Sequence, residues 1–161
     1  MTIRGGGQPQ ISLPLSGSGT IDSTLRCAAR TVETSSCQFA DVVVAVPVGR
    51  VDHQSAAQLE AALAPLVQEA SGNKGALVLD FAGVEYISSV GLRVLMIAAK
   101  QLRASDAKIA VANLQPVVAE ILAISRFDRI LSVFPSVRAA IEQFSVAALA
   151  AFDVARPPSS R

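Results

Sequence analysis

Aromatic, histidine and cysteine residues are scarce in this 161-residue sequence. Aromatic residues make up 4% of it, with one tyrosine and no tryptophan, while hydrophobic residues together make up 51%. The core is therefore expected to be aliphatic. The single histidine, His53, has no catalytic partner of defined geometry. A zinc site needs about four ligands, more than this histidine and the two cysteines provide. Neither a metal centre nor a serine–histidine–aspartate triad is expected.

Excess charge of one sign and long apolar runs are also missing. The chain carries 14 basic and 13 acidic residues, a formal net charge of +1, which gives no strong electrostatic footprint for nucleic acid or an anionic membrane. The most apolar stretch, Val90–Ala99, is interrupted by Arg93 and is too short to span a bilayer. Arg4 is followed by Gly5–Gly7 rather than by the apolar segment of a secretory signal. We therefore expect a cytoplasmic protein with no direct nucleic-acid contact and no membrane insertion.

The cysteines and glycines give little support to an enzyme. Cys27 and Cys37 lie ten residues apart, and two reduced thiols are favoured over a disulfide in a bacterial-type cytosolic protein. No G-x-x-x-x-G-K-[ST] loop is present, and Gly5–Gly7 precedes no strand–helix unit that could hold a phosphate. No cofactor is expected.

The two ends of the chain differ in composition from its middle. Residues 1–30 are rich in glycine, serine, threonine and glutamine, which predicts a flexible N-terminal extension or at most one added strand. Residues 151–161 are expected to form a C-terminal tail that ends in RPPSSR. A single domain is expected between them, over residues 31–150.

Strand and helix patterns alternate within this domain. Val42–Val48 is nearly all β-branched and predicts a buried strand, and Thr31–Phe39 predicts an antiparallel partner that turns at Ala40–Asp41. Further strands are expected at Ala76–Phe81, Lys108–Asn113 and Ile130–Phe134. With the helices between them, this order predicts an α/β fold: a small mixed, mostly parallel sheet of four to five strands with about four helices packed on it.

Four helices are expected. The first begins at Ser55-Ala-Ala-Gln58, which has the spacing of a capping box, and the second covers about Ser89–Ala104. Pro116 suits the first position of the third, and Pro135-Ser136 begins the fourth. The residues expected to face the core are Leu59, Leu63, Leu66 and Val67 in the first, Val117, Val118, Ile121, Leu122 and Ile124 in the third, and Val137, Ala140, Ile141 and Phe144 in the fourth.

The stretch YISSVGLRVL contains the feature that points to a specific function. It places two adjacent hydroxyls, Ser88 and Ser89, at the start of the second helix, where free backbone N–H groups favour negative charge. One interpretation is a helix cap. The other is a phosphoacceptor, because a phosphate would add roughly −1.5 to −2 charges that the helix tolerates and that a docked partner would not. This position suits a switch of binding better than a switch of folding.

Three neighbouring residues are further candidates. Asp52 follows a strand and precedes a helix, so it should reach the same edge of the sheet as Ser89; it would orient the serine hydroxyl or a kinase-bound metal, or simply cap its helix. His53 is interpreted as a surface or contact residue. Leu92, in the first helical turn, is either a core residue or a small apolar anchor for a partner.

Three segments together resemble a known family. They are Gly49–Asp52, the run LVLDFAGVEYISSVGL and the run FDRILSVFPSVRAAIEQF, and they resemble the STAS domain, most closely the stand-alone anti-sigma factor antagonists of bacteria. The resemblance covers about Thr31–Leu149. It implies a binding module that docks on an anti-sigma factor, itself a serine kinase, and so releases a sigma factor. Phosphorylation of one serine then separates the pair, and a PP2C-type phosphatase resets it.

The resemblance also assigns roles to residues. The family motif reads Asp-Ser-Ser/Thr-Gly-Leu, and alignment on Gly91 and Leu92 places the phosphoacceptor at Ser89, the aspartate at Ser88 and the second hydroxyl at Val90. Ser88 is the second choice as acceptor. Asp52 matches the family's acidic residue near the phosphorylation site, and Leu92 matches a partner-contact position.

Two other functions fit the same sequence. STAS domains also occur as accessory parts of lipid or anion transport systems, which this chain could join only as a separate subunit. A nucleotide-binding sensor is the third possibility, and the missing phosphate loop argues against it.

Overall fold

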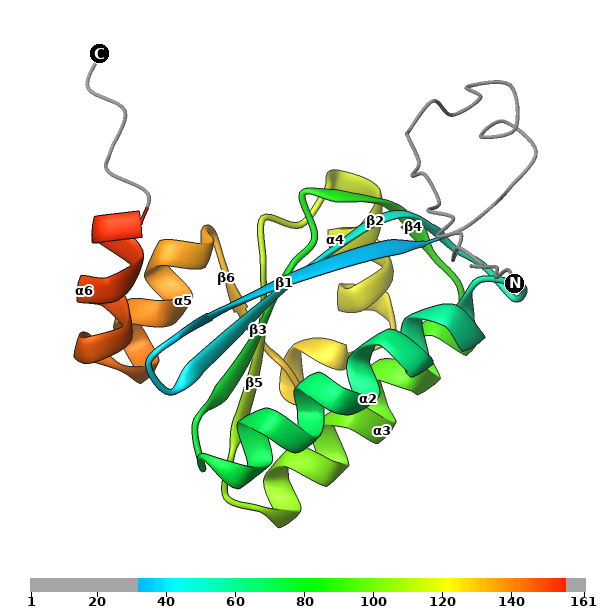
Figure 1. Cartoon of the computed structure of the whole chain (residues 1–161). Helices are drawn as coiled ribbons and strands as arrows, with labels where there is room; N and C mark the ends of the chain where they lie inside the picture. The colour runs from blue at the N-terminus through cyan, green and yellow to red at the C-terminus, as the bar shows by residue number, and fades with distance from the viewer. Residues whose placement is uncertain (1–31, 156–161) are drawn as a thin grey trace, which may run out of the picture.

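A mixed, six-stranded sheet with helices on both faces organises the computed structural model, which describes residues 32–155 (Figure 1). Its strands are β1 (Glu33–Phe39), β2 (Val42–Val51), β3 (Ala76–Asp80), β4 (Gly83–Ile87), β5 (Lys108–Ala112) and β6 (Ser132–Phe134). Its helices are α2 (Ala56–Gly72), α3 (Ser89–Ala104), α4 (Pro116–Ile124), the 3-10 turn η1 (Phe127–Arg129), α5 (Val137–Phe144) and α6 (Val146–Ala155). The N-terminal extension predicted over residues 1–30 lies outside the described residues.

The sheet confirms the predicted class. The strands run in the order β1-β2-β3-β5-β6, with β1 antiparallel to β2 and the other neighbours parallel. The turn between β1 and β2 falls at Ala40, whose φ of 53° is left-handed. The sheet is mixed and mostly parallel, as expected, with one strand more than the predicted four to five.

The additional strand is β4, which sequence analysis treated as a short connection. The long strand β2 pairs with β3 over Val42–Ala45 and with β4 over Val48–Val51, so β3 and β4 follow one another along the same side of β2. The register shifts between Gly49 and Arg50, which leaves one extra residue in β4. Val84 and Ile87 are therefore both buried although they are three residues apart. This bulge removes the alternating pattern by which a strand is recognised in a sequence.

Each face of the sheet has its own aliphatic core. Helices α2 and α3 lie side by side on one face, where α4 also packs, and α5 and α6 cover part of the other (Figure 1). Alternate residues of β2 point to opposite faces: Val43 belongs to the first core and Val42 and Val44 to the second. Phe81 is the one aromatic residue among the largest fully buried side chains. The expectation of an aliphatic core is confirmed.

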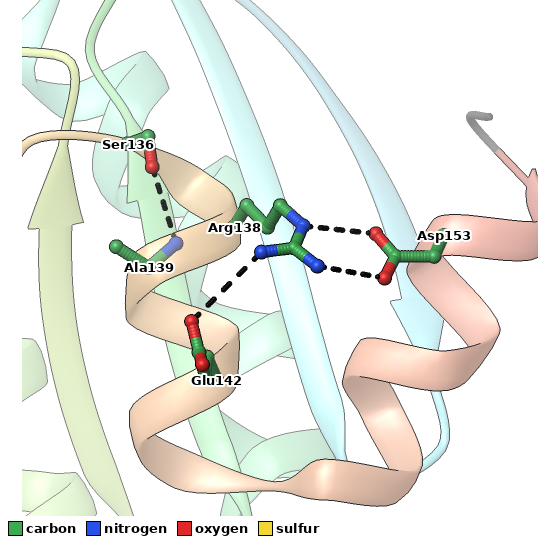
Figure 2. A network of polar contacts seen from close by, with 5 residues as sticks. All are labelled: Ser136, Arg138, Ala139, Glu142 and Asp153. Carbon is green, nitrogen blue, oxygen red and sulfur yellow. Dashed lines mark hydrogen bonds and ion pairs between the residues drawn. The ribbon is translucent and has the colours of Figure 1, made fainter. Parts of the chain in front are cut away.

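The last two helices are joined by a charged pair that Figure 2 shows. Arg138 of α5 donates from Nε and Nη2 to the two carboxylate oxygens of Asp153 of α6, at 3.1 and 3.0 Å. This hydrogen bond and the negative charge of Asp153 raise the pKa of the Arg138 guanidinium. Between the helices, Ser145 Oγ donates to Asp41 Oδ1 at 2.6 Å, which ties the α5–α6 junction to the β1–β2 turn.

Three boundaries or faces differ from the predictions. The tail predicted from residue 151 is wrong at its start, because α6 continues to Ala155. This helix packs on β1 and α5, contacts that no local sequence pattern reveals.

The apolar face predicted for α4 is also partly wrong, since Val118 and Leu122 are buried while Val117 and Ile124 are 54% and 75% exposed. The last strand begins at residue 132 rather than 130. The predicted inward face of the next helix is confirmed, with Val137, Ala140 and Ile141 buried.

Among the helices of residues 32–155, each is too short or too polar to cross a membrane.

Candidate functional site

The candidate site lies where β2 and β4 end side by side. Their last register partners are Val51 and Ile87, and the ladder continues one step further, because the N–H of Ser88 donates to the carbonyl oxygen of Val51 at 2.8 Å. Asp52, the residue after Val51, is therefore held at the same edge as the serine pair. The structure brings these residues together as the strand–helix order predicted.

The two serines have different roles in the structure. Ser88 is the N-cap residue of α3: its backbone is extended (φ −88°, ψ 171°), and its Oγ accepts a hydrogen bond from the N–H of Gly91 at 3.3 Å. Ser89 is the first residue of the helix and is exposed, and its hydroxyl makes no hydrogen bond with the described residues. The capping interpretation therefore applies to Ser88, and the hydroxyl of Ser89 is left accessible.

The electrostatic environment of Ser89 favours added negative charge. The first turn of α3 contains no acidic side chain, so nothing on this turn neutralises the partial positive charge of the helix N-terminus. Arg93, one turn further along, is exposed. A phosphate on Ser89 would be placed at a helix end that tolerates it, next to a cationic side chain on the same helix.

Asp52 caps the neighbouring helix. Its Oδ1 accepts hydrogen bonds from the N–H groups of Gln54 and Ser55, both at 3.0 Å, and lies 3.0 Å from Ser55 Oγ. This is the plainer of the two roles considered for Asp52. Its role in orienting the acceptor serine or a metal stays a prediction.

The capping box predicted at Ser55-Ala-Ala-Gln58 is wrong. Ser55 is fully buried, and its Oγ donates to the carbonyl oxygen of Arg50 at 2.7 Å and accepts from the N–H of Asp52 at 2.9 Å, so it makes no cap bond to α2. Gln58 Oε1 accepts instead from the N–H of Val32 at 3.1 Å, at the start of β1. The side chains of Ser55 and Gln58 therefore bond to the ends of β2 and β1 instead of to the first turn of α2.

The remaining candidates divide into surface and core. His53 is exposed in the turn after β2, and Val90 is 36% exposed beside Ser89. Gly91 is buried, and a Cβ atom there would lie 2.5 Å from Val51 Cγ1 and 2.8 Å from Ile87 Cγ1. Leu92 is only 7% exposed and belongs to the first core, so the core interpretation accounts for its side chain. Its contact with a partner stays a prediction.

A pair of side chains that no sequence motif predicted lies beside this edge. The guanidinium carbon of Arg50 lies 4.8 Å from the centre of the Tyr86 ring, and the two residues are register partners on β2 and β4. An exposed arginine stacked on a half-buried tyrosine near the serines is a suitable contact for a partner protein. The pair could have been found only by recognising β4 and its register.

The mixed α/β sheet and the accessible serine at the helix start after β4 are the features expected of a STAS domain. This chain belongs to the STAS domain family, whose model matches residues 32–140. It is similar to BtrV of Bordetella bronchiseptica, a protein named as a candidate anti-sigma factor antagonist. The two are 39% identical over 116 residues, which cover 72% of this chain and 90% of BtrV.

Solved structures share the fold. An anti-sigma factor antagonist from Mycobacterium paratuberculosis superposes with a TM-score of 0.62 at 24% identity, over 70% of this chain and 92% of that one. The Bacillus cell fate determinant SpoIIAA, in its phosphorylated form, superposes with a TM-score of 0.53 at 16% identity, over 69% and 98% of the two chains. At these identities the likeness shows the fold alone.

Proposed function

We propose that this chain is an anti-sigma factor antagonist, a binding module rather than an enzyme, that regulates sigma-factor-dependent transcription. The observation that carries the proposal is the accessible, unbonded hydroxyl of Ser89 at the N-terminus of α3, beside Asp52. The similarity to BtrV supports the same function. In its unphosphorylated form the protein binds an anti-sigma factor in the cytoplasm, and that binding releases the sigma factor.

Phosphorylation of Ser89 by the anti-sigma factor, acting as a serine kinase, is the proposed off-switch. The phosphate adds roughly −1.5 to −2 charges at neutral pH. The helix N-terminus and Arg93 tolerate this charge, so the fold persists. A partner in contact with Ser89 and Val90 would have to desolvate the phosphate. Binding becomes tenfold weaker for every increment of about 1.4 kcal/mol in this desolvation free energy. A PP2C-type phosphatase restores the binding form.

Ser88 is a poorer acceptor for a structural reason. Its hydroxyl is half-buried and accepts the N–H of Gly91, so a kinase would have to break the helix cap to reach it. The family's aspartate is replaced at this position, but the serine supplies the capping oxygen that an aspartate would also supply. The replacement therefore preserves the cap and removes one negative charge next to the acceptor.

The experiment that tests this function measures the intact mass of the protein after incubation with ATP and each anti-sigma kinase of its source organism. Wild type and Ser88→Ala are expected to gain one phosphate, and Ser89→Ala none. Ser132→Ala, at an exposed serine on β6, is the matched control and should be labelled like wild type. Label retained in Ser89→Ala would contradict the assignment of the site. No label with any kinase, together with stable binding to a transporter ATPase, would favour the transport alternative.

A further inference from the structure

Within residues 32–155, helices cover the second face of the sheet only in part. Along β2, the side chains on this face change from fully buried at Val42 and 5% exposed at Val44 to 49% exposed at Val48. Helices α5 and α6 cover the buried end, and the other end of the β1–β2 ribbon has no helix over it in this view (Figure 1). The boundary between the two regions falls at Val46.

At this boundary lies a hollow of about 290 Å³. Its walls are mostly apolar and come from β1, β2, α5 and α6; they include Phe39, Val44, Val46, Val137 and Phe152. The rings of Phe39 and Phe152 meet edge to face with their centres 5.3 Å apart. The pair Arg138–Asp153 holds α6, and with it Phe152, against α5 (Figure 2). A hollow of this size and lining is close to the smallest ligand pockets of proteins.

One carboxylate, that of Asp80 at the end of β3, reaches the hollow. Asp80 Oδ1 accepts from the N–H of Ala82 at 3.1 Å and from Asn113 Nδ2 at 2.9 Å. Its other oxygen has no hydrogen bond or ion pair with the described residues, and among residues 32–155 no basic side chain lines the hollow. Asp80 as a residue is half-buried, and a carboxylate beside apolar walls favours a cationic or N–H-donating group as its partner.

We propose that this hollow binds a small organic cation: an ammonium or guanidinium group carried on a compact aliphatic or aromatic body. The cationic group pairs with the free oxygen of Asp80, and the body packs against Phe39, Val46 and Phe152. The site is distinct from the serine edge. It lies on the face of the sheet opposite to α2 and α3, and Ala155, the last residue of α6, is part of its lining.

The test is a ¹H–¹⁵N chemical-shift titration of the full chain with 2-phenylethylamine, compared with the neutral 2-phenylethanol and the anionic 3-phenylpropanoate. The amine is expected to cause saturable shifts at Cys37, Phe39 and Phe152, and the anion none. Asp80→Asn keeps an amide oxygen for Ala82 and Asn113 but removes the charge, and should weaken amine binding about tenfold, as expected for the loss of a charged hydrogen bond. Asp106→Asn, an exposed site outside the hollow, is the matched control.

A second variant tests the apolar walls. Val46→Phe should fill the hollow and abolish binding of the amine, whereas Val117→Phe, on the exposed side of α4, should leave it unchanged. Equal affinity for the amine and the alcohol, or an unchanged affinity in Asp80→Asn, would overturn the proposal, because the hollow would then be only an apolar surface.

Discussion

The backbone N–H of Ser88 donates to the carbonyl oxygen of Val51 at 2.8 Å, which fastens the start of α3 to the end of β2. Asp52 follows Val51 directly and caps α2. One ladder bond between two strands thus sets the relative position of two helix starts. The serine pair and the acidic residue next to it are held by backbone, so their placement does not depend on the rotamer of either side chain.

Removing each serine hydroxyl in turn should separate stability from labelling. Ser88→Ala loses the cap bond to Gly91 and should lower the free energy of unfolding by about 1 kcal/mol. Ser89→Ala removes an exposed hydroxyl without a bond, and should leave stability unchanged while abolishing phosphorylation. Urea unfolding measures the first and intact mass the second. A larger loss of stability in Ser89→Ala than in Ser88→Ala would mean that the capping serine has been misassigned.

Gly91 is expected to be intolerant of any side chain. A Cβ atom there would lie 2.5 Å from Val51 Cγ1 and 2.8 Å from Ile87 Cγ1, both on buried residues. Gly91→Ala should therefore cost about 1–3 kcal/mol of folding free energy, read from the midpoint of chemical unfolding. The double variant Gly91→Ala with Val51→Ala removes the nearer of the two conflicting atoms and should recover part of the loss. If the two losses simply added in the double variant, steric overlap with Val51 would not be the cause.

Asp52 is expected to stabilise the start of α2. Asp52→Ala leaves the N–H groups of Gln54 and Ser55 without their acceptor and should destabilise the fold by roughly 1–2 kcal/mol. Asp52→Asn keeps an acceptor oxygen and should cost less. Glu60→Ala, at an exposed position of the same helix, is the control for helix propensity. Thermal unfolding of wild type and the three variants gives their order of stability. Equal stability of Asp52→Ala and wild type would contradict the capping role.

Thr34 offers a stabilising substitution. Its Oγ1 is buried in β1 and has no hydrogen-bond partner among the described residues. Thr34→Val replaces the hydroxyl by a methyl group of nearly the same shape and should stabilise the fold by about 1 kcal/mol, because an unpaired buried hydroxyl is removed. Thr34→Ser keeps the hydroxyl, loses the methyl group and should destabilise instead. Denaturant midpoints for the two variants should thus move in opposite directions from wild type.

The pair Arg138–Asp153 should control the docking of α6 more than the global fold. Asp153→Asn removes the carboxylate that accepts both guanidinium nitrogens, so backbone amides of α6 should exchange with solvent faster while those of α5 do not. Glu142→Gln is the control, since that carboxylate is 3.9 Å from Arg138. High salt should reduce the difference between wild type and Asp153→Asn, because the pair is partly exposed. Equal acceleration across both helices would mean that they unfold as one unit.

Much of the fold follows from local patterns. The β-branched run Val42–Val48 and the apolar run Ala76–Phe81 are strands, and Pro116 is at the first position of its helix, as predicted. The helix predicted at Ser89–Ala104 has these bounds in the structure. These features depend on residues within a few positions of one another, so the sequence shows them directly.

The site could be predicted in position but not in detail. Proximity of Asp52 and Ser89 followed from the rule that parallel strands end at one edge, but the bond partners of Ser55 and Gln58 did not. Ser55 bonds to the backbone of β2, and Gln58 bonds to the N–H of Val32 at the start of β1. Both bonds depend on how β1 and β2 are placed against α2. Ile124 likewise satisfies the helical pattern and yet is exposed, because no element of residues 32–155 covers that side of α4.

Local propensity and the spacing of apolar residues suffice to predict the α/β class, the aliphatic core and the location of a serine pair at a helix start. Three further features require the packed strands and helices: Ser88 caps the helix while Ser89 stays accessible, β4 extends the sheet, and Gly91 has no room for a side chain. These depend on the bulged register between β2 and β4, a relation between residues more than thirty positions apart. No local pattern carries that register, since it is set by which side chains fit together when the two strands meet.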